Sequence, residues 1–371
     1  MPKKIKTFDL LLLLIPVILI VTGVSVIFSL LASSGNNVET VHQIFNAVIG
    51  IILMLAVAFT DYRFFRGTNW IFYVASIILL LAVLFVGKTT NGATNWLDLK
   101  VFQLQPSEIT KIFLIITLSS FFSNKIGKIR WIDILISFAI LALPLALVAK
   151  EPDFGTAMIM VLLYFTMLFL SKPSKNQLVL IFSGIAIVLT IGLLAIFNVK
   201  PFGNLFRDYQ RSRIMVFVNP SLDPLGRGYN VKQAQITIGS GGVLGKGLGK
   251  GTQSQLQFLP EAHTDFIFAG IAESFGFVGV FTIISLYLYF ITRLIDIATL
   301  SRDNFGMLIV FGIASMFFFQ ALINIGMNIG LMPVTGIPLP FLSYGGTSLI
   351  ISLFATGLVE SIFIRHKKIT F

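Results

Sequence analysis

The sequence predicts an all-α polytopic membrane protein, with about ten transmembrane helices and a large outer loop between the seventh and the eighth. Two observations support this fold class. The 371 residues are 56% hydrophobic and only 12% charged, and their mean hydropathy is +0.91, which is far outside the range of soluble domains. The apolar residues also gather in stretches of roughly 17 to 25, each long enough as a helix to cross about 30 Å of hydrocarbon.

Ten such stretches follow one another along the chain. They cover residues 9–31, 42–60, 69–87, 107–122, 132–149, 153–171, 177–197, 266–292, 305–328 and 341–364. The first is not a cleavable signal peptide, because it runs from Leu10 to Leu31 and a second span follows after a short turn. We therefore treat residues 1–371 as one membrane domain, with 198–265 as a long outer loop. Cysteine is absent, which excludes disulfides and thiolate metal sites.

The distribution of Lys and Arg predicts the orientation. Short cytoplasmic loops retain positive charge, and placing the N-terminus inside puts fifteen of the 27 Lys and Arg residues on inner segments. Both termini are therefore expected in the cytoplasm. These basic residues are scattered over short loops, so the net charge of +11 reflects topology and attraction to anionic lipids. Nucleic acid is not expected as a partner.

Acidic residues gather on the outer side of this topology. Ionisable groups at or within a membrane are costly and usually mark a site. The outer loops and outer span ends hold Asp98, Glu108, Glu151, Asp153, Glu261, Asp265 and Glu273. A transporter would instead favour sites near the midplane and internal repeats, and no convincing repeat is visible. An enzyme acting at the outer leaflet is therefore the preferred class, with a transporter as the alternative.

The outer segment NGATNWLDLKVFQLQPSEITK contains three candidate residues. Glu108 and Lys111 are three apart, so they share a face of the helix that begins near Pro106. They either pair with each other for structural reasons, or Lys111 binds an anion while Glu108 orients it. Trp96 is either an interfacial belt residue or a platform on which a sugar ring stacks.

Two further outer segments leave alternatives open. In AKEPDFGTA, Asp153 either caps the sixth span or contributes to an acidic site. The loop GSGGVLGKGLGKGTQSQ includes Lys246 and Lys250 but fails the spacing of a nucleotide-binding phosphate loop. Its glycines either expose backbone N–H groups to an anion such as pyrophosphate or form a flexible surface loop.

Polar residues also mark the ninth span and the segment after it. Gln320, Asn324 and Asn328 recur every four residues, which predicts hydrogen bonding between helices. The following segment, GLMPVTGIPLPFLSYGGTS, is rich in Pro and Gly, and irregular backbone at this depth survives only beside protein or a water-filled cavity. We expect it to line a cavity, with Ser343 as a candidate substrate-binding residue.

The segment FLPEAHTDFIF places His263 and Asp265 directly before the eighth span. Together with NWLDLKVFQLQPSEITK, EPDFGTAMI and PVTGIPLPFLSYGGTSLI, and the long stretch from DYQRSRIMVF to GFVG, it resembles the SEDS (shape, elongation, division, sporulation) family over residues 9–365. The stretch GTQSQLQFLPEAHTDFIF is more similar to the elongation branch of that family than to its division branch. Relatives commonly have another residue where this chain has Glu151, so no fixed role is assigned to it.

The resemblance implies a ten-span peptidoglycan glycosyltransferase that polymerises lipid II at the outer face of the bacterial cytoplasmic membrane, for cell elongation and rod shape. The family's essential acidic residue maps onto Asp265, and other important positions map onto Trp96, Glu108, Lys111 and Asp153. Expected partners are a class B penicillin-binding protein transpeptidase and other membrane proteins of the elongation complex. The alternatives are a lipid II flippase and a division-type polymerase.

This function implies roles for individual residues. Lipid II carries an α-linked sugar and the product is β-1,4-linked, which suggests inversion with Asp265 as the base. Lys111 is expected to face the pyrophosphate, and the weaker candidates are Arg211, Arg213, Lys246 and Lys250. His263 is expected to act through hydrogen bonding. A divalent cation such as Mg²⁺ or Mn²⁺ is compatible with these residues, but their spacing does not require one.

Small residues in spans eight and nine predict where a partner helix docks. Close helix approach needs small side chains. The predicted docking surface contains Gly306, Gly312, Ala314 and Ser315.

Overall fold

The structure is a computed structural model that describes residues 8–32, 37–90, 93–98, 103–196, 211, 215–224, 226–256 and 258–366. Ten helices of 17 or more residues lie in this part of the chain, and each overlaps one predicted span. They are α1 (Leu10–Leu31), α2 (Val38–Phe59), α4 (Asn69–Val86), α5 (Pro106–Phe122), α6 (Trp131–Lys150), α7 (Phe154–Leu170), α8 (Lys175–Ile196), α12 (Ile267–Leu300), α13 (Asn304–Asn328) and α14 (Gly346–Ile364). The predicted all-α membrane fold is confirmed.

Length and apolarity suit these helices for a bilayer. Eight of those described are long and apolar enough to cross a membrane, and α7 is a shorter apolar helix. The remaining helix, α5, carries Glu108 and Lys111 and is almost wholly enclosed by the others. Burial of α5 explains how a span can hold two charges, because protein rather than lipid surrounds them.

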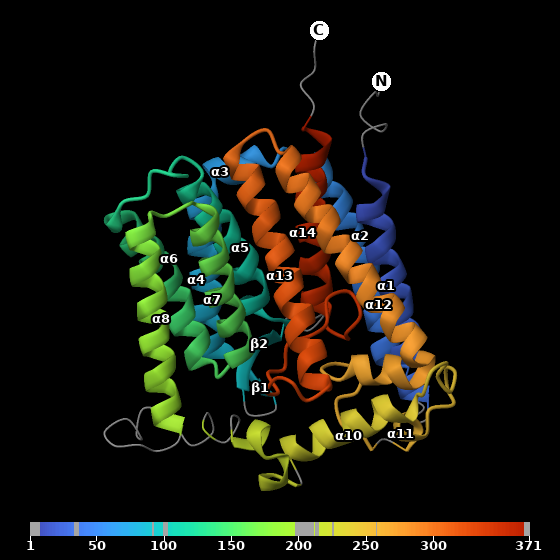
Figure 1. Cartoon of the computed structure of the whole chain (residues 1–371). Coiled ribbons are helices and arrows are strands. Elements are labelled where there is room, and N and C mark those ends of the chain that lie inside the picture. Colours follow the sequence, from blue (N-terminus) through green and yellow to red (C-terminus); the bar gives the residue numbers. More distant parts are fainter. Residues whose placement is uncertain are drawn as a thin grey trace, which may run out of the picture.

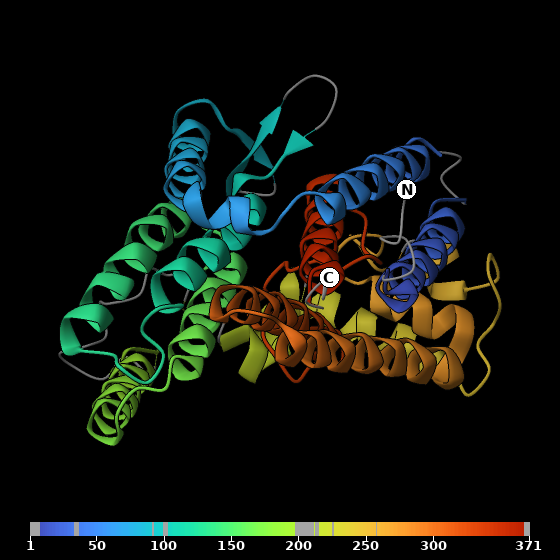
Figure 2. The same ribbon diagram turned by 90° about the horizontal axis from the view of Figure 1, so that it is seen from above.

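The helices form a bundle with a distinct centre and edge (Figures 1 and 2). Two-thirds of the spanning part of α13 and of α14 (67% each) is buried, against 11% for α8, which lies at the edge of the bundle. α14 packs mainly on α2, and α13 packs on α12, α5 and α7. The centre of the protein is therefore built from α5, α13 and α14.

Shorter elements connect the helices. At one end of the bundle is α3 (Arg63–Gly67). At the opposite end are β1 (Lys88–Thr90), β2 (Ala93–Asp98) and β3 (Gln103–Leu104), together with η4 (Pro220–Leu222), α10 (Arg227–Ser240) and α11 (Thr252–Gln255). The strands form an antiparallel sheet in the order β1-β2-β3, with Lys88 opposite Trp96 and Leu97 opposite Leu104. The long predicted outer loop thus contains helices, and α10 lies across the end of the bundle (Figure 1).

The eighth predicted span begins where α12 begins, but the sequence did not predict that α12 is broken at Gly276 (φ 65°, ψ −163°). A straight helix of 34 residues would be about 51 Å long, well beyond the thickness of the hydrocarbon. The glycine-rich loop supplies the hydrogen bonds that the break removes. Lys246 N donates to Glu273 O and Phe277 N donates to Gly242 O, both at 2.9 Å. Residues 267–275 therefore form a short helix that is separated by the break from the longer part of α12.

Three of the four small residues named for the docking surface on spans eight and nine are packed inside the chain. A Cβ at Gly312 would lie 2.6 Å from Ile115 Cγ2 of α5, and one at Gly306 would lie 3.2 Å from the ring of Tyr62. Ala314 is 3% exposed. Gly306, Gly312 and Ala314 therefore permit close packing inside the chain and are not available to a partner helix. Ser315 is half-buried, and docking elsewhere on these two spans stays a prediction.

The start of α1 and the end of α14 meet at the end of the bundle opposite α10. Asp9 N donates to Glu360 Oε1 at 2.8 Å, and Arg293 Nε donates to Asp9 Oδ2 at 2.7 Å. The described chain therefore begins and ends on one side, in agreement with the even number of spans. That this side faces the cytoplasm remains a prediction.

Candidate active site

Asp265 lies directly before α12, at the end of the bundle that carries α10, and α13 fixes its main chain. Its carbonyl oxygen accepts from Asn324 Nδ2 at 3.0 Å and from Asn328 Nδ2 at 3.1 Å. Asn324 Nδ2 also donates to Ile337 O at 2.8 Å. The polar stripe predicted on the ninth span thus joins α13 to two irregular segments. One segment carries Asp265, and the other is the Pro- and Gly-rich loop before α14.

The surroundings of the Asp265 side chain disfavour its charged form. Gly336, with φ 76°, brings the loop main chain against the carboxylate, and a Cβ there would lie 3.6 Å from Oδ2. Burial raises the pKa of Asp265 to about 7, and the negative charges of Glu261 and Asp153 add to the shift. A carboxyl with a pKa near neutrality suits general base chemistry.

Asp153 joins α7 to the start of α5. It caps α7 by accepting from Thr156 N at 3.0 Å, as predicted, and its Oδ2 also accepts from Ser107 Oγ at 3.2 Å and Gln105 Nε2 at 3.4 Å. Two residues after Asp153, the Gly155 main chain lies so close to Thr335 that a Cβ on Gly155 would be 2.8 Å from the Thr335 carbonyl oxygen. The start of α5, the start of α7 and the loop beside Asp265 therefore form one continuous site.

Glu108 and Lys111 form a buried ion pair in α5. Lys111 Nζ donates to Glu108 Oε1 at 2.6 Å, and Lys111 and Glu108 are 1% and 3% exposed. The predicted pairing is therefore present, and it compensates two charges that would be costly alone. An ammonium group has three N–H donors, so pairing with Glu108 does not use up the capacity of Lys111 to hold an anion.

Lys246 is engaged elsewhere. Its Nζ donates to Glu273 Oε1 at 2.9 Å, to Ser240 Oγ at 2.9 Å and to Thr252 Oγ1 at 2.7 Å. Glu273 Oε2 also accepts from Ser254 N at 3.1 Å. These contacts tie the glycine-rich loop to the broken helix, so the surroundings of Lys246 are those of a structural residue.

The other predicted site residues have varied surroundings. Trp96 is half-buried on β2, a strand that contacts α4 and α5. Ser343 is 4% exposed and its Oγ accepts from Leu339 N at 2.8 Å within the loop before α14. His263 Nε2 lies 3.2 Å from Glu39 Oε2 of α2. Arg211 is half-buried, and Arg213 lies outside the described residues.

Comparison with known proteins assigns the family. The family model for FtsW, RodA and SpoVE, described as "Cell cycle protein", matches residues 3–368. The chain belongs to this family, the SEDS family.

Several relatives of this SEDS protein are similar over almost their whole length. The peptidoglycan glycosyltransferase MrdB of Escherichia coli (strain K12) is 38% identical, and the alignment covers 100% of this chain and 98% of MrdB. A chain from a solved peptidoglycan synthase complex is 30% identical with a TM-score of 0.81, covering 97% and 98% of the two chains. RodA of Thermus thermophilus is 27% identical with a TM-score of 0.70, covering 96% of each.

Glu151 is a further ionisable residue of the SEDS site to which the sequence assigned no role. It follows α6, is 1% exposed, and neither carboxylate oxygen has a hydrogen-bond partner within the described residues. Burial raises its pKa from 4.5 to about 8, and the Asp153 charge adds to the shift. The carbonyl end of α6 also disfavours negative charge here. Glu151 is therefore protonated at neutral pH.

We expect Glu151→Gln to be at least as stable as the wild type, with the advantage growing as pH rises from about 5 to 8. The folded protein keeps the Glu151 proton at pH values where the unfolded chain loses it, so the wild type loses stability over this interval. A Gln side chain is neutral over the whole pH range, so no charge is buried in the variant at any pH. Thermal melting in detergent across this range measures the difference. Asp98→Asn, at an exposed carboxylate, is the control and should show no such trend. A difference between Glu151→Gln and the wild type that stays constant with pH would contradict a neutral Glu151.

Carboxylates in the described part of this SEDS protein do not form a metal site. No group of three or more His, Asp or Glu residues there could hold an ion. The divalent cation that the sequence permits but does not require is therefore given no role in the proposed reaction.

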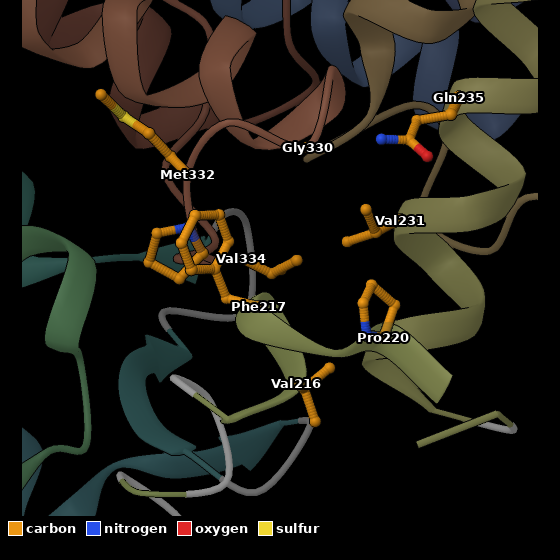
Figure 3. A pocket seen from close by; sticks show the side chains of 9 residues that line it. Val216, Phe217, Pro220, Val231, Gln235, Gly330, Met332 and Val334 are labelled. Atoms are coloured by element: carbon orange, nitrogen blue, oxygen red, sulfur yellow. The ribbon is translucent and has the colours of Figure 1, made fainter. Parts of the chain in front are cut away.

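An apolar pocket lies beside the site, between α10 and the segment that follows α13 (Figure 3). It is lined by Val216, Phe217, Pro220, Val231, Gln235, Gly330, Met332, Pro333 and Val334. Val334 also packs against the cluster that contains Phe266 and Ala269. Two short chain segments therefore connect the pocket to Asp265. Residues 265–269 carry Asp265 and pack against Val334, and residues 334–336 run from the pocket wall to Gly336 beside the Asp265 carboxylate.

Proposed function

We propose that this protein is an inverting peptidoglycan glycosyltransferase that polymerises lipid II at the outer face of the bacterial cytoplasmic membrane during cell elongation. One observation carries the proposal. Asp265, with a pKa of about 7, lies beside Asp153 and the start of α5 at one end of the bundle. Similarity to MrdB along the whole chain supports the activity, and similarity to RodA of Thermus thermophilus, described as a rod shape determining protein, supports the elongation role.

The proposed reaction is a single displacement. The 4-hydroxyl oxygen of the acceptor sugar attacks the anomeric carbon of the donor, and Asp265 takes the hydroxyl proton. The bond between that carbon and the pyrophosphate oxygen breaks, and undecaprenyl pyrophosphate leaves. Attack from the face opposite the leaving group turns the α linkage into a β-1,4 linkage.

Charge grows on the pyrophosphate as it departs, and Lys111 is the proposed stabilising cation. Trp96 and Ser343 remain proposed contacts to the sugar and its substituents.

A transpeptidase is the proposed partner, since a polymerase alone leaves glycan strands uncrosslinked. The solved peptidoglycan synthase complex is described as coordinating polymerization and crosslinking. We propose a class B penicillin-binding protein, together with other membrane proteins of the elongation complex. Both termini are proposed to face the cytoplasm and the Asp265 end to face outward.

A flippase for the same lipid is the second candidate, and a reconstitution experiment separates the two. Purified protein, with and without a cognate transpeptidase, receives labelled lipid II in detergent, and in liposomes with the label confined to one leaflet. We expect glycan polymers that depend on Asp265. Transbilayer movement of lipid II without polymer would contradict the polymerase and support the flippase.

A further inference from the structure

The first turn of α2 contacts the segment that carries Asp265. Glu39 Oε2 of α2 lies 3.2 Å from His263 Nε2, and the Glu39 and His263 side chains are 31% and 23% exposed. The His263 ring also packs against Tyr344, with 5.7 Å between the ring centroids. Tyr344 N donates to His263 O at 2.9 Å. His263 therefore has neighbours on three sides: Glu39 lies beside its ring nitrogen, the Tyr344 ring packs on its ring, and Tyr344 N donates to its carbonyl oxygen.

Gln43, one turn further along α2, holds the neighbouring segment. Its Nε2 donates to Ser343 O at 3.0 Å, and its Oε1 accepts from Gly345 N at 3.3 Å. Gln43 is 1% exposed. Side chains from one face of α2 thus hydrogen-bond to the segment before α14 through Gln43 and contact the segment before α12 through Glu39, whose Oε2 has no hydrogen-bond partner within the described residues.

These contacts hold one side of the Asp265 segment, and α13 holds the other. His263 is two residues before Asp265, whose carbonyl oxygen accepts from Asn324 and Asn328. The short segment 263–265 therefore lies between α2 and α13. Removing the Glu39 contact would leave the Asp265 carbonyl group held by α13 and the His263 carbonyl group held by Tyr344 N, so the His263 side chain is the part of this segment that would be released.

We propose that Glu39 and His263 form a positioning pair that sets the direction of the Asp265 carboxylate, and that His263 does not contact the substrate. This inference rests on the proposed polymerase function. It assigns a role to Glu39, a residue 226 positions away from Asp265 in the sequence. It also assigns His263, a candidate site residue in the sequence, to placement of the base and not to contact with the substrate.

The test compares Glu39→Ala, His263→Ala and the double variant in lipid II polymerisation, with rates normalised to folded protein. Misplacing a catalytic group by about 1 Å can cost about 100-fold in rate. We therefore expect each single variant to lower kcat by about 10- to 100-fold while KM stays within about 3-fold. The kcat of the double variant should be no lower than the kcat of the less active single variant, because both changes remove the same contact. His42→Ala, an exposed residue on the same helix, is the control and should match the wild type.

Three results would overturn the proposal: a wild-type kcat in Glu39→Ala, an increase in KM alone in His263→Ala, or losses that add in the double variant. A reversed pair covers the case in which an alanine variant fails to fold. Glu39→His combined with His263→Glu should recover at least part of the kcat lost in either change alone, and no recovery would contradict the pair. Failure of the polymerase function itself is distinguishable, because the wild type and His42→Ala would then also make no glycan.

Discussion

Asp265→Asn is expected to insert, fold and bind its partner, yet to lose nearly all lipid II polymerisation. Asn has almost the same size and keeps the main-chain contacts to α13, but it cannot take up the acceptor proton. General base catalysis contributes about 100- to 10,000-fold, and the loss should fall in that range. Labelled lipid II measures the rate. Asp296→Asn, on the opposite end of α12 and 65% exposed at its side chain, should retain full activity.

The pKa of Asp265 adds two checks on this prediction. Wild-type activity should rise with pH through about 7, since only the carboxylate accepts a proton. The folded pKa lies above the unfolded value, so the wild type loses stability as pH rises through the same interval, and Asp265→Asn should be at least as stable near pH 8. Substantial activity in a well-folded Asp265→Asn protein would exclude the general base role.

Exchanging Glu108 and Lys111 is expected to abolish polymerisation while the protein still folds. The exchange keeps a buried ion pair, whereas removing one partner leaves an uncompensated charge that costs about 3 to 5 kcal/mol. Glu108 lies in the first turn of α5, where a Lys is less favourable, so a stability loss of up to about 2 kcal/mol is expected. Moving the ammonium by almost one turn would remove it from the pyrophosphate and lower the rate by about 100-fold or more.

The exposed pair Lys88 and Asp98, 3.5 Å apart at the same end of the bundle, provides the matched control. Its exchange should leave both activity and melting temperature unchanged, since exposed ion pairs contribute little. Near-normal polymerisation by the protein with Glu108 and Lys111 exchanged would show that this buried pair is structural and would exclude Lys111 as the phosphate ligand.

The helices were predictable because membrane spans depend on a local property, the length of an apolar stretch. Features that depend on contacts distant in the sequence were not. Hydropathy continues without interruption through Gly276, and only the dihedral angles reveal the break. The spacing of Asn324 and Asn328 placed them on one helix face, but could not show that Asp265 is their acceptor.

Burial explains the remaining differences in the site. The string EPD identified Glu151 as an outer acidic residue, but its raised pKa follows from packing that the sequence does not encode locally. Gly306 and Gly312 looked suited to a partner helix because small residues permit close approach both between two proteins and between helices of one chain. The contact between Glu39 and His263 joins residues 224 positions apart, and no motif links them.

Asn324 and Asn328 of α13 determine at what stage of chain synthesis the proposed active site can be assembled. Asn324 and Asn328 follow Asp265 by 59 and 63 residues, so ribosomes finish α12 well before the groups that hold the Asp265 carbonyl exist. A chain halted between these points would have eight spans in the bilayer and an unsupported base. The proposed active site can therefore be complete only after the ninth span has inserted into the membrane.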